Sequence, residues 1–143
     1  MRYLVSVLLL LVAPFASASG CVERFTGLWK ASTPSADGKM LDVVVQYRDD
    51  GAFAVLISLA GEASLSSLAF GHWTCSEAEL VTRVNRIGGK DVSPSEPGMT
   101  TVYAVSNHLG GSFLAKPEGQ SHTELYTRLE GTFEEHLHEV LSP

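Results

Sequence analysis

Residues that commonly bind metals or act in catalysis are sparse in this chain, and their spacing does not match known metal-binding or catalytic motifs. His136 and His138 lie two positions apart within the acidic segment Glu134 to Glu139. On a helix, residues two apart point to different sides, so this pair cannot chelate one metal ion. The zinc-binding motif H-E-x-x-H would need histidines four apart. We therefore expect no metal site and interpret the segment as a solvated acidic face.

Nucleophilic catalysis and phosphate binding lack their usual motifs as well. The chain has no G-x-S-x-G sequence of the α/β-hydrolase kind, and Gly110-Gly111-Ser112 forms a turn pattern and nothing more. No glycine-rich phosphate loop leads from a strand into a helix. His72, His108 and His122 are single histidines near predicted strand ends, where packing or surface roles are the default. We expect no catalytic residues and no cofactor.

The N-terminal residues 1–18 predict that the chain is exported. They begin with a short basic start, continue with an apolar run from Leu4 to Val12, and end in Ala16-Ser17-Ala18. This is the layout of a secretory signal peptide with an A-x-A cleavage site. The apolar run is too short to span a bilayer. We expect cleavage after Ala18, which leaves residues 19–143 as a single domain.

The two cysteines, Cys21 and Cys75, both follow that segment. An exported chain meets an oxidising compartment, and two cysteines are what one disulfide requires. Such a bridge, closing a loop of about 54 residues, would contribute roughly 3–4 kcal/mol in the chain-entropy model. In the alternative, residues 18–21 resemble a bacterial lipoprotein box, so that Cys21 would carry a lipid anchor. The expected location is accordingly periplasmic or secreted, or, in the alternative, membrane-anchored.

Charge and hydropathy exclude several classes of partner. Ten Lys and Arg residues stand against 16 Asp and Glu residues, for a formal net charge of −6, and the basic residues form no cluster. Such a chain is poorly suited to a nucleic-acid backbone. After residue 18 the longest apolar run is Ala52 to Ile57, which is far too short for a transmembrane helix.

From Phe25 onward the apolar residues follow period 2, which is typical of β-strands. Asp49-Asp50-Gly51 predicts a tight hairpin between two strands with apolar faces, although Val44 breaks the alternation of the first. Those faces are Leu41, Val43, Val45 and Tyr47, and then Phe53, Val55, Ile57 and Leu59. We expect further strands at residues 65–70, 80–87, 100–106, 112–116 and 122–129, and a long mobile loop at Gly88 to Gly98.

About eight short strands with regular turn signals predict an all-β antiparallel barrel or sandwich. The last residues change character. Thr132 to Glu135 fits a helix capping box, and the apolar residues Phe133, Leu137, Val140 and Leu141 then fall on one helical stripe. We expect one short C-terminal helix lying on the barrel wall.

Several short motifs resemble the lipocalin-like, or calycin-type, group of small bacterial proteins. They are Phe25-x-Gly27-x-Trp29, Asp50-Gly51-x-Phe53, Gly71-x-Trp73 and Tyr126-Thr127-Arg128. The resemblance implies an up-and-down barrel whose floor is closed by Trp29, with Arg128 packed across the indole. A cation–π contact of that kind contributes about 0.5–2 kcal/mol.

The resemblance also implies a function: a non-enzymatic protein that holds a small apolar ligand in the barrel lumen. The residues predicted to point inward and to contact the ligand are Val43, Val45, Tyr47, Phe53, Val55, Ile57 and Tyr103. Eight strands enclose an interior that is either just filled or able to hold one ligand. A filled barrel acting as a structural or protein-interaction module of the bacterial envelope is therefore the alternative, and an enzyme is a third hypothesis.

If a ligand binds, access must come through one open end. The Gly88–Gly98 loop is the expected lid, because long loops in compact domains are usually functional or disordered. Lys90, Asp91 and Glu96 would give this lid a polar rim.

Overall fold

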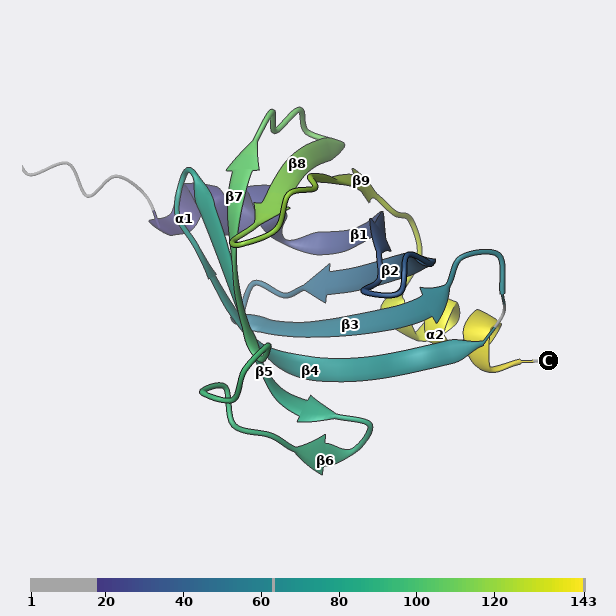
Figure 1. Ribbon diagram of the computed structural model, residues 1–143. Coiled ribbons are helices and arrows are strands. Elements are labelled where there is room, and N and C mark those ends of the chain that lie inside the picture. Colours follow the sequence, from purple (N-terminus) through teal and green to yellow (C-terminus); the bar gives the residue numbers. More distant parts are fainter. Residues whose placement is uncertain (1–17, 63, 143) are drawn as a thin grey trace, which may run out of the picture.

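A closed antiparallel barrel of eight strands dominates the computed structural model, which describes residues 18–62 and 64–142 (Figure 1). The predicted all-β, up-and-down barrel is thereby confirmed. The strands of the ring are β1 (Gly27–Pro34), β2 (Met40–Tyr47), β3 (Ala52–Leu59), β4 (Leu65–Cys75), β5 (Glu79–Ile87), β7 (Thr100–Ser106), β8 (Ser112–Pro117) and β9 (Glu124–Arg128).

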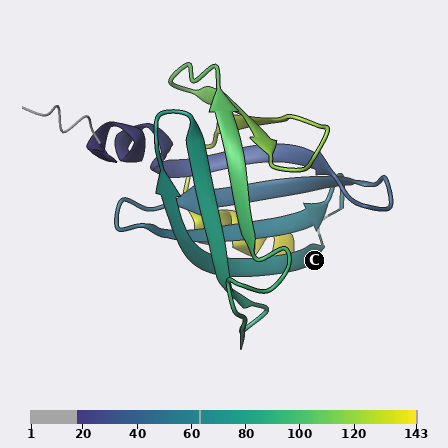
Figure 2. The ribbon, with the colours of Figure 1, turned by 60° about the vertical axis from the view of Figure 1, so that its left-hand side comes forward.

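Each strand of the ring pairs with its neighbour in sequence, and the pairing of β1 with β9 closes the circle. The closing register sets Trp29 opposite Arg128. Closure removes the exposed strand edges that promote aggregation. Figure 2 shows β5 and β7 crossing over the run of β1 to β4, so that two walls face each other. The architecture is consistent with a lipocalin-like fold.

The predicted hairpin between β2 and β3 is confirmed, and its geometry explains the residues found there. Gly51 has a φ of 84°, a conformation that glycine adopts without steric cost. Its backbone N–H donates to the Arg48 carbonyl, and the Asp50 carboxylate accepts from the N–H of Ala52. This local chemistry fixes the register of the two strands that carry most of the predicted inward residues.

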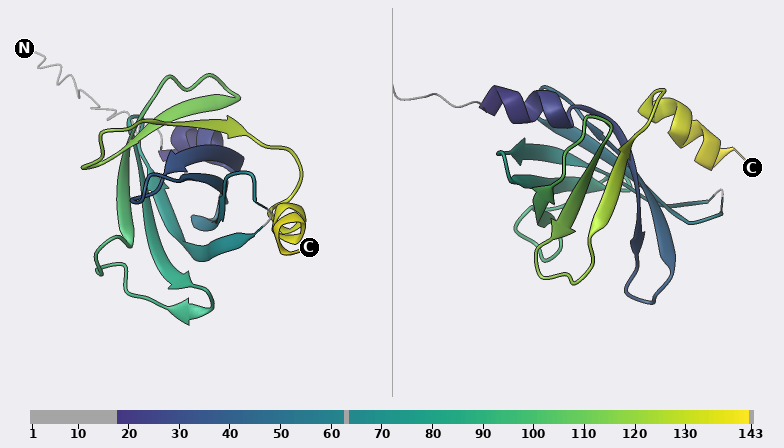
Figure 3. Two further views of the ribbon diagram at one scale, coloured as in Figure 1. Left: turned by 45° about the vertical axis from the view of Figure 1, so that its right-hand side comes forward. Right: turned by 90° about the horizontal axis from the view of Figure 1, so that it is seen from above.

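The segment before β1 is a helix, α1 (Ala18–Phe25), which the sequence reading missed. The expectation that strand character begins at Phe25 was therefore wrong, and β1 begins at Gly27. Cys21 and Phe25 lie four residues apart, hence on one helix face, and both are buried. In the left view of Figure 3, α1 lies behind the strands of the barrel. The predicted signal peptide lies outside the described residues except for Ala18.

The predicted C-terminal helix is confirmed as α2 (Phe133–Leu141), including the reciprocal capping box of Thr132 and Glu135. Figure 3 shows α2 against the outside of the barrel wall. Val44 breaks the alternation of β2 because it faces this outer apolar layer, where Phe133, Leu137 and Val140 also pack. Leu141 was wrongly placed on the packed stripe, since it is 58% exposed as the last residue of the helix. Neither helix of the described chain could cross a membrane.

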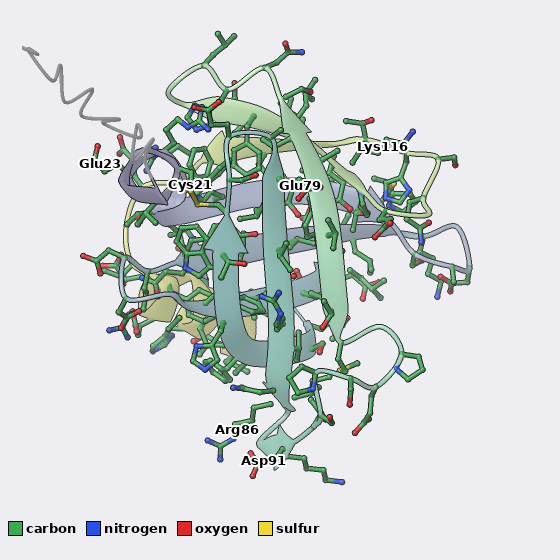
Figure 4. The ribbon with its side chains drawn as sticks, turned by 90° about the vertical axis from the view of Figure 1, so that its left-hand side faces the viewer. Cys21, Glu23, Glu79, Arg86, Asp91 and Lys116 are labelled. Carbon is green, nitrogen blue, oxygen red and sulfur yellow. A yellow bond between two sulfur atoms is a disulfide. The ribbon has the colours of Figure 1, made fainter. Side chains whose placement is uncertain are left out.

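Part of the predicted loop at residues 88–98 is ordered strand. Lys90–Asp91 forms β6, which pairs with the end of β5 and extends it beyond the ring. The N–H of Gly88 donates to Leu68 and that of Val92 to Asn85, so the hairpin continues along β4 and β5. Figure 4 shows Arg86 and Asp91 at its tip, away from the body of the barrel.

Candidate functional site

One end of the barrel is closed by α1 and a disulfide. Cys21 of α1 is bonded to Cys75 at the end of β4, with their Cα atoms 6.0 Å apart (Figure 4). The predicted bridge is confirmed. A sulfur atom held in a disulfide cannot also carry a thioether-linked lipid, and Cys21 is only 3% exposed. The pairing therefore argues against the lipid anchor at Cys21, and it is compatible with an oxidising compartment outside the cytoplasm.

Behind α1, aromatic rings fill the interior. The ring of Phe113 lies 5.1 Å from Phe25, 4.8 Å from Trp29 and 4.9 Å from Tyr126, measured between ring centres. Phe25, Trp29 and Phe113 have no solvent-exposed surface. The Trp29 indole N–H donates to the Phe25 carbonyl, so its one polar group is satisfied. Edge-to-face and stacked pairs of this kind add stability beyond the area they bury.

Arg128 closes this end from the outside. Its guanidinium carbon lies 4.2 Å from the centre of the Trp29 ring, and its N–H groups donate to the carbonyls of Thr26 and Arg24. Gly27 lies directly beneath the guanidinium with a φ of 134°. A side chain at position 27 would collide with Arg128 Nη1 and strain the backbone. The glycine of the G-x-W motif thus makes room for the arginine that covers the tryptophan.

Farther along the lumen the side chains stop short of filling the barrel. A cavity of about 200 Å³ lies inside the ring, and all seven residues predicted to point inward line it: Val43, Val45, Tyr47, Phe53, Val55, Ile57 and Tyr103. These residues come mainly from β2 and β3. The structure therefore brings the candidate contact residues together around one space, and their role in binding a ligand stays a prediction.

The opposite wall of the cavity is polar and was not anticipated from the sequence. It includes Glu124, which is only 7% exposed although its side chain is a carboxylic acid. Glu124 Oε1 accepts from the Thr33 hydroxyl at 2.8 Å and lies 3.3 Å from His122 Nε2, while Oε2 accepts from the Tyr126 hydroxyl at 2.7 Å. The residues of the lining that sequence reasoning missed are Thr33, Thr82, Val84, Thr101, Glu124 and Tyr126.

A signal for Glu124 and Tyr126 was present in the sequence. The resemblance already assigned Arg128 to the barrel floor, and side chains of a strand alternate between faces. Tyr126 and Glu124 must then share the face of Arg128, whereas the apolar Leu125 points outward and is 53% exposed. Hydrophobicity alone would have predicted the opposite orientation of β9, with Leu125 facing inward and Glu124 facing solvent.

Burial controls the protonation of the three tyrosines in the lumen. Burial, together with the charge of Glu124, raises the pKa of Tyr103 to about 12, and hydrogen bonding to Thr101, Tyr126 and Thr82 offsets this only in part. Burial is also the main reason that the pKa values of Tyr47 and Tyr126 lie well above their usual range. All three phenols are therefore neutral at physiological pH. The Tyr126 hydroxyl already donates to Glu124.

Access to the cavity is from the end opposite α1. A second, more open hollow of about 490 Å³, here called the vestibule, shares Thr33, Thr101, Tyr103 and Glu124 with the cavity. Its remaining lining comes from the ends of β1 and β8 and from the loops that follow them: Pro34, Ser35, Ala36, Pro117, Gln120 and His122.

The expectation that residues 88–98 form the lid was wrong. Of the described residues, none between Gly88 and Gly98 lines the cavity or the vestibule. The reason is that Lys90 and Asp91 form β6 and pair with the end of β5, so they do not cross the mouth of the barrel.

The histidines lie on different parts of the fold, except for His136 and His138, which share α2. His122 belongs to the vestibule, and His108 packs against Phe25 with their ring centres 5.4 Å apart. On α2, His136 lies 3.5 Å from Glu139, and His138 lies within hydrogen-bond distance of Ser142. The described residues contain no group of three or more potential ligands placed to hold a metal ion.

No protein-family model matches the sequence, and a search of curated proteins finds no match.

Proposed function

We propose that this protein is an exported, lipocalin-like binding protein that holds one small, predominantly apolar molecule in the barrel lumen without chemical conversion. The observation that carries the proposal is the cavity of about 200 Å³ bordered by the apolar faces of β2 and β3. Binding pockets are typically apolar and contain a few placed polar groups, and Glu124 and Tyr103 supply such groups here.

The size of the cavity limits the ligand. An apolar cavity of about 150 Å³ is enough to hold benzene, whereas pockets for drug-sized molecules range from about 300 to 1,000 Å³. The lumen at about 200 Å³ therefore suits a single ring or a short branched chain. A longer molecule would have to extend into the vestibule, which is continuous with the lumen through Thr33, Thr101, Tyr103 and Glu124.

The disulfide supports a periplasmic or secreted location, because such bonds persist in oxidising compartments. The signal-peptide pattern of residues 1–18 points the same way. A filled barrel acting as an envelope interaction module would need a packed interior, so the cavity favours the binding protein over that alternative.

The proposal is tested with toluene, whose single ring fits the lumen. We expect residues 19–143 to bind toluene, detected by ligand-observed NMR, and Val55→Trp to abolish binding because the added indole occupies the cavity. The control is Leu125→Trp, which adds the same ring to the outer face of β9. If the wild-type protein binds neither toluene nor a singly substituted ring of similar size, or if Val55→Trp binds toluene as well as the wild-type protein does, lumenal binding of a predominantly apolar molecule is refuted.

A further inference from the structure

The lumen contains a buried acid without a basic partner. Glu124 is 7% exposed, and in the part of the chain that the structure describes no lysine or arginine lines the cavity or the vestibule. The only ion-pair contact of Glu124 among the described residues is His122, which is charged only when protonated. A buried carboxylate is costly unless it is paired and hydrogen-bonded, so this position favours a positive charge brought from outside.

The hydrogen bonds around Glu124 leave room for one more donor. Two oxygens of a carboxylate offer about four acceptor sites. Thr33, His122 and Tyr126 occupy three of them. Because Glu124 lines both the lumen and the vestibule, the remaining site can be reached by a molecule lying in the cavity.

A second polar group borders the same space. Tyr47 is 3% exposed and lines the cavity. Burial, together with the nearby Tyr103 and Glu124, raises its pKa well above the usual range, so its hydroxyl keeps its proton. A neutral hydroxyl on the cavity wall can donate and accept hydrogen bonds, so Tyr47 offers a polar contact to a bound molecule.

From this arrangement we infer that the ligand is a small amine: an apolar body on the wall of β2 and β3, and a protonated amino group on Glu124. The inference rests on the proposed function and specifies its ligand class. The body contacts Val45, Val55 and Ile57, while the ammonium group donates to the Glu124 carboxylate. The same negative charge repels carboxylates, so the lumen disfavours fatty and aromatic acids of similar size.

The experiment compares three probes with the same ring: benzylamine, toluene and benzoate. Affinities are measured by calorimetry or NMR titration at neutral pH, where benzylamine is protonated and benzoate is ionised. We expect benzylamine to bind at least about tenfold more tightly than toluene, since a hydrogen bond to a charged group is worth about 1.5–3 kcal/mol. Benzoate should bind more weakly than both.

Glu124→Gln keeps the shape of the side chain and removes its charge, so the advantage of benzylamine over toluene should disappear. Glu118→Gln is the matched control: Glu118 is exposed on the β8–β9 loop, and its loss changes the net charge equally. That variant should retain the preference for benzylamine. Circular dichroism establishes whether each variant is folded, and the wild-type probe series is decisive even if Glu124→Gln does not fold.

The outcomes separate this inference from the proposed function. If toluene binds as tightly as benzylamine, or if a folded Glu124→Gln retains the preference, the amine inference is overturned while the binding function stands. If none of the three probes binds, both are overturned.

Discussion

The two ends of the barrel use aromatic side chains in different ways. At the closed end, Phe25, Trp29 and Phe113 contact one another, and the Trp29 N–H is satisfied by a backbone carbonyl. Toward the open end, Tyr103 borders both the cavity and the vestibule. The difference indicates that the closed end stabilises the fold, whereas the lumen leaves polar groups available for a ligand.

Tyr126 joins the two regions. Its ring stacks on Phe113 with an interplanar angle of 4°, and its hydroxyl donates to Glu124. The packed end therefore holds the polar wall of the lumen in place through one side chain. Such support is needed because a binding site is effective when its contact groups are fixed before the ligand arrives.

The largest effect is expected at the closed end. Trp29→Ala should reduce the free energy of unfolding by roughly 3–5 kcal/mol, because it opens a cavity among fully buried rings. Ile57→Ala, which enlarges an existing cavity, should cost less. Chemical denaturation of both variants measures the difference. Equal losses would contradict the division between a stabilising end and a binding lumen.

Removing the disulfide should have the next largest effect. Cys75→Ser is expected to lower the free energy of unfolding by about 2–5 kcal/mol, since the bridge spans 54 residues of sequence and ties α1 to β4. Thermal unfolding with and without reductant provides the check: reductant should lower the melting temperature of the wild-type protein and leave that of the variant unchanged. Toluene binding below the melting temperature should persist, because neither cysteine lines the lumen.

Alkaline pH should destabilise the fold through the lumen. The pKa of Tyr103 is about 12 in the folded protein and about 10 when unfolded, so the folded form retains its proton between these values. Its contribution is fully present below pH 10 and is lost as the pH rises toward 12, on the order of 2 kcal/mol. Phenolate absorbance should therefore appear together with unfolding.

Tyr103→Phe should move that alkaline transition to higher pH, because one of the buried phenols has been removed. Residues 19–143 contain three tyrosines, and all of them have raised pKa values. Phenolate absorbance that develops near pH 10 while the protein remains folded would contradict the burial of these phenols.

The smallest effect is expected for Arg128. Arg128→Ala should cost about 0.5–1 kcal/mol, because the guanidinium is solvent-exposed and a cation–π contact of that kind is weak. Arg128→Lys should restore only part of this, since an ammonium group lacks the planar surface that lies on the indole. Denaturation curves of the two variants compare them. A loss as large as that of Trp29→Ala would show that Arg128 is essential to closure.

The amino-acid sequence determined the features that depend on near neighbours. Alternation within β2 and β3 assigned their inward faces, Asp50 and Gly51 specified the hairpin, and Thr132 with Glu135 specified the start of α2. Each of these follows from side-chain direction or from hydrogen bonds within a few residues. For that reason six of the seven candidate contact residues could be named from β2 and β3 before their surroundings were known, and the seventh, Tyr103, lies on β7.

Tertiary structure alone decided what those inward faces enclose. Whether a barrel is filled depends on side chains from opposite walls meeting in space, and their distance is set by the β1–β9 and β4–β5 pairings. Long-range packing also placed the acidic Glu124 inside the barrel and the apolar Leu125 outside, the opposite of what their hydrophobicity predicts. The reason is that Tyr126, which shares a strand face with Glu124, belongs to the buried aromatic cluster. The sequence thus determined which residues of β2 and β3 face inward, and only the assembly across the ring left a cavity beside a buried acid, because packing joins residues far apart in the chain.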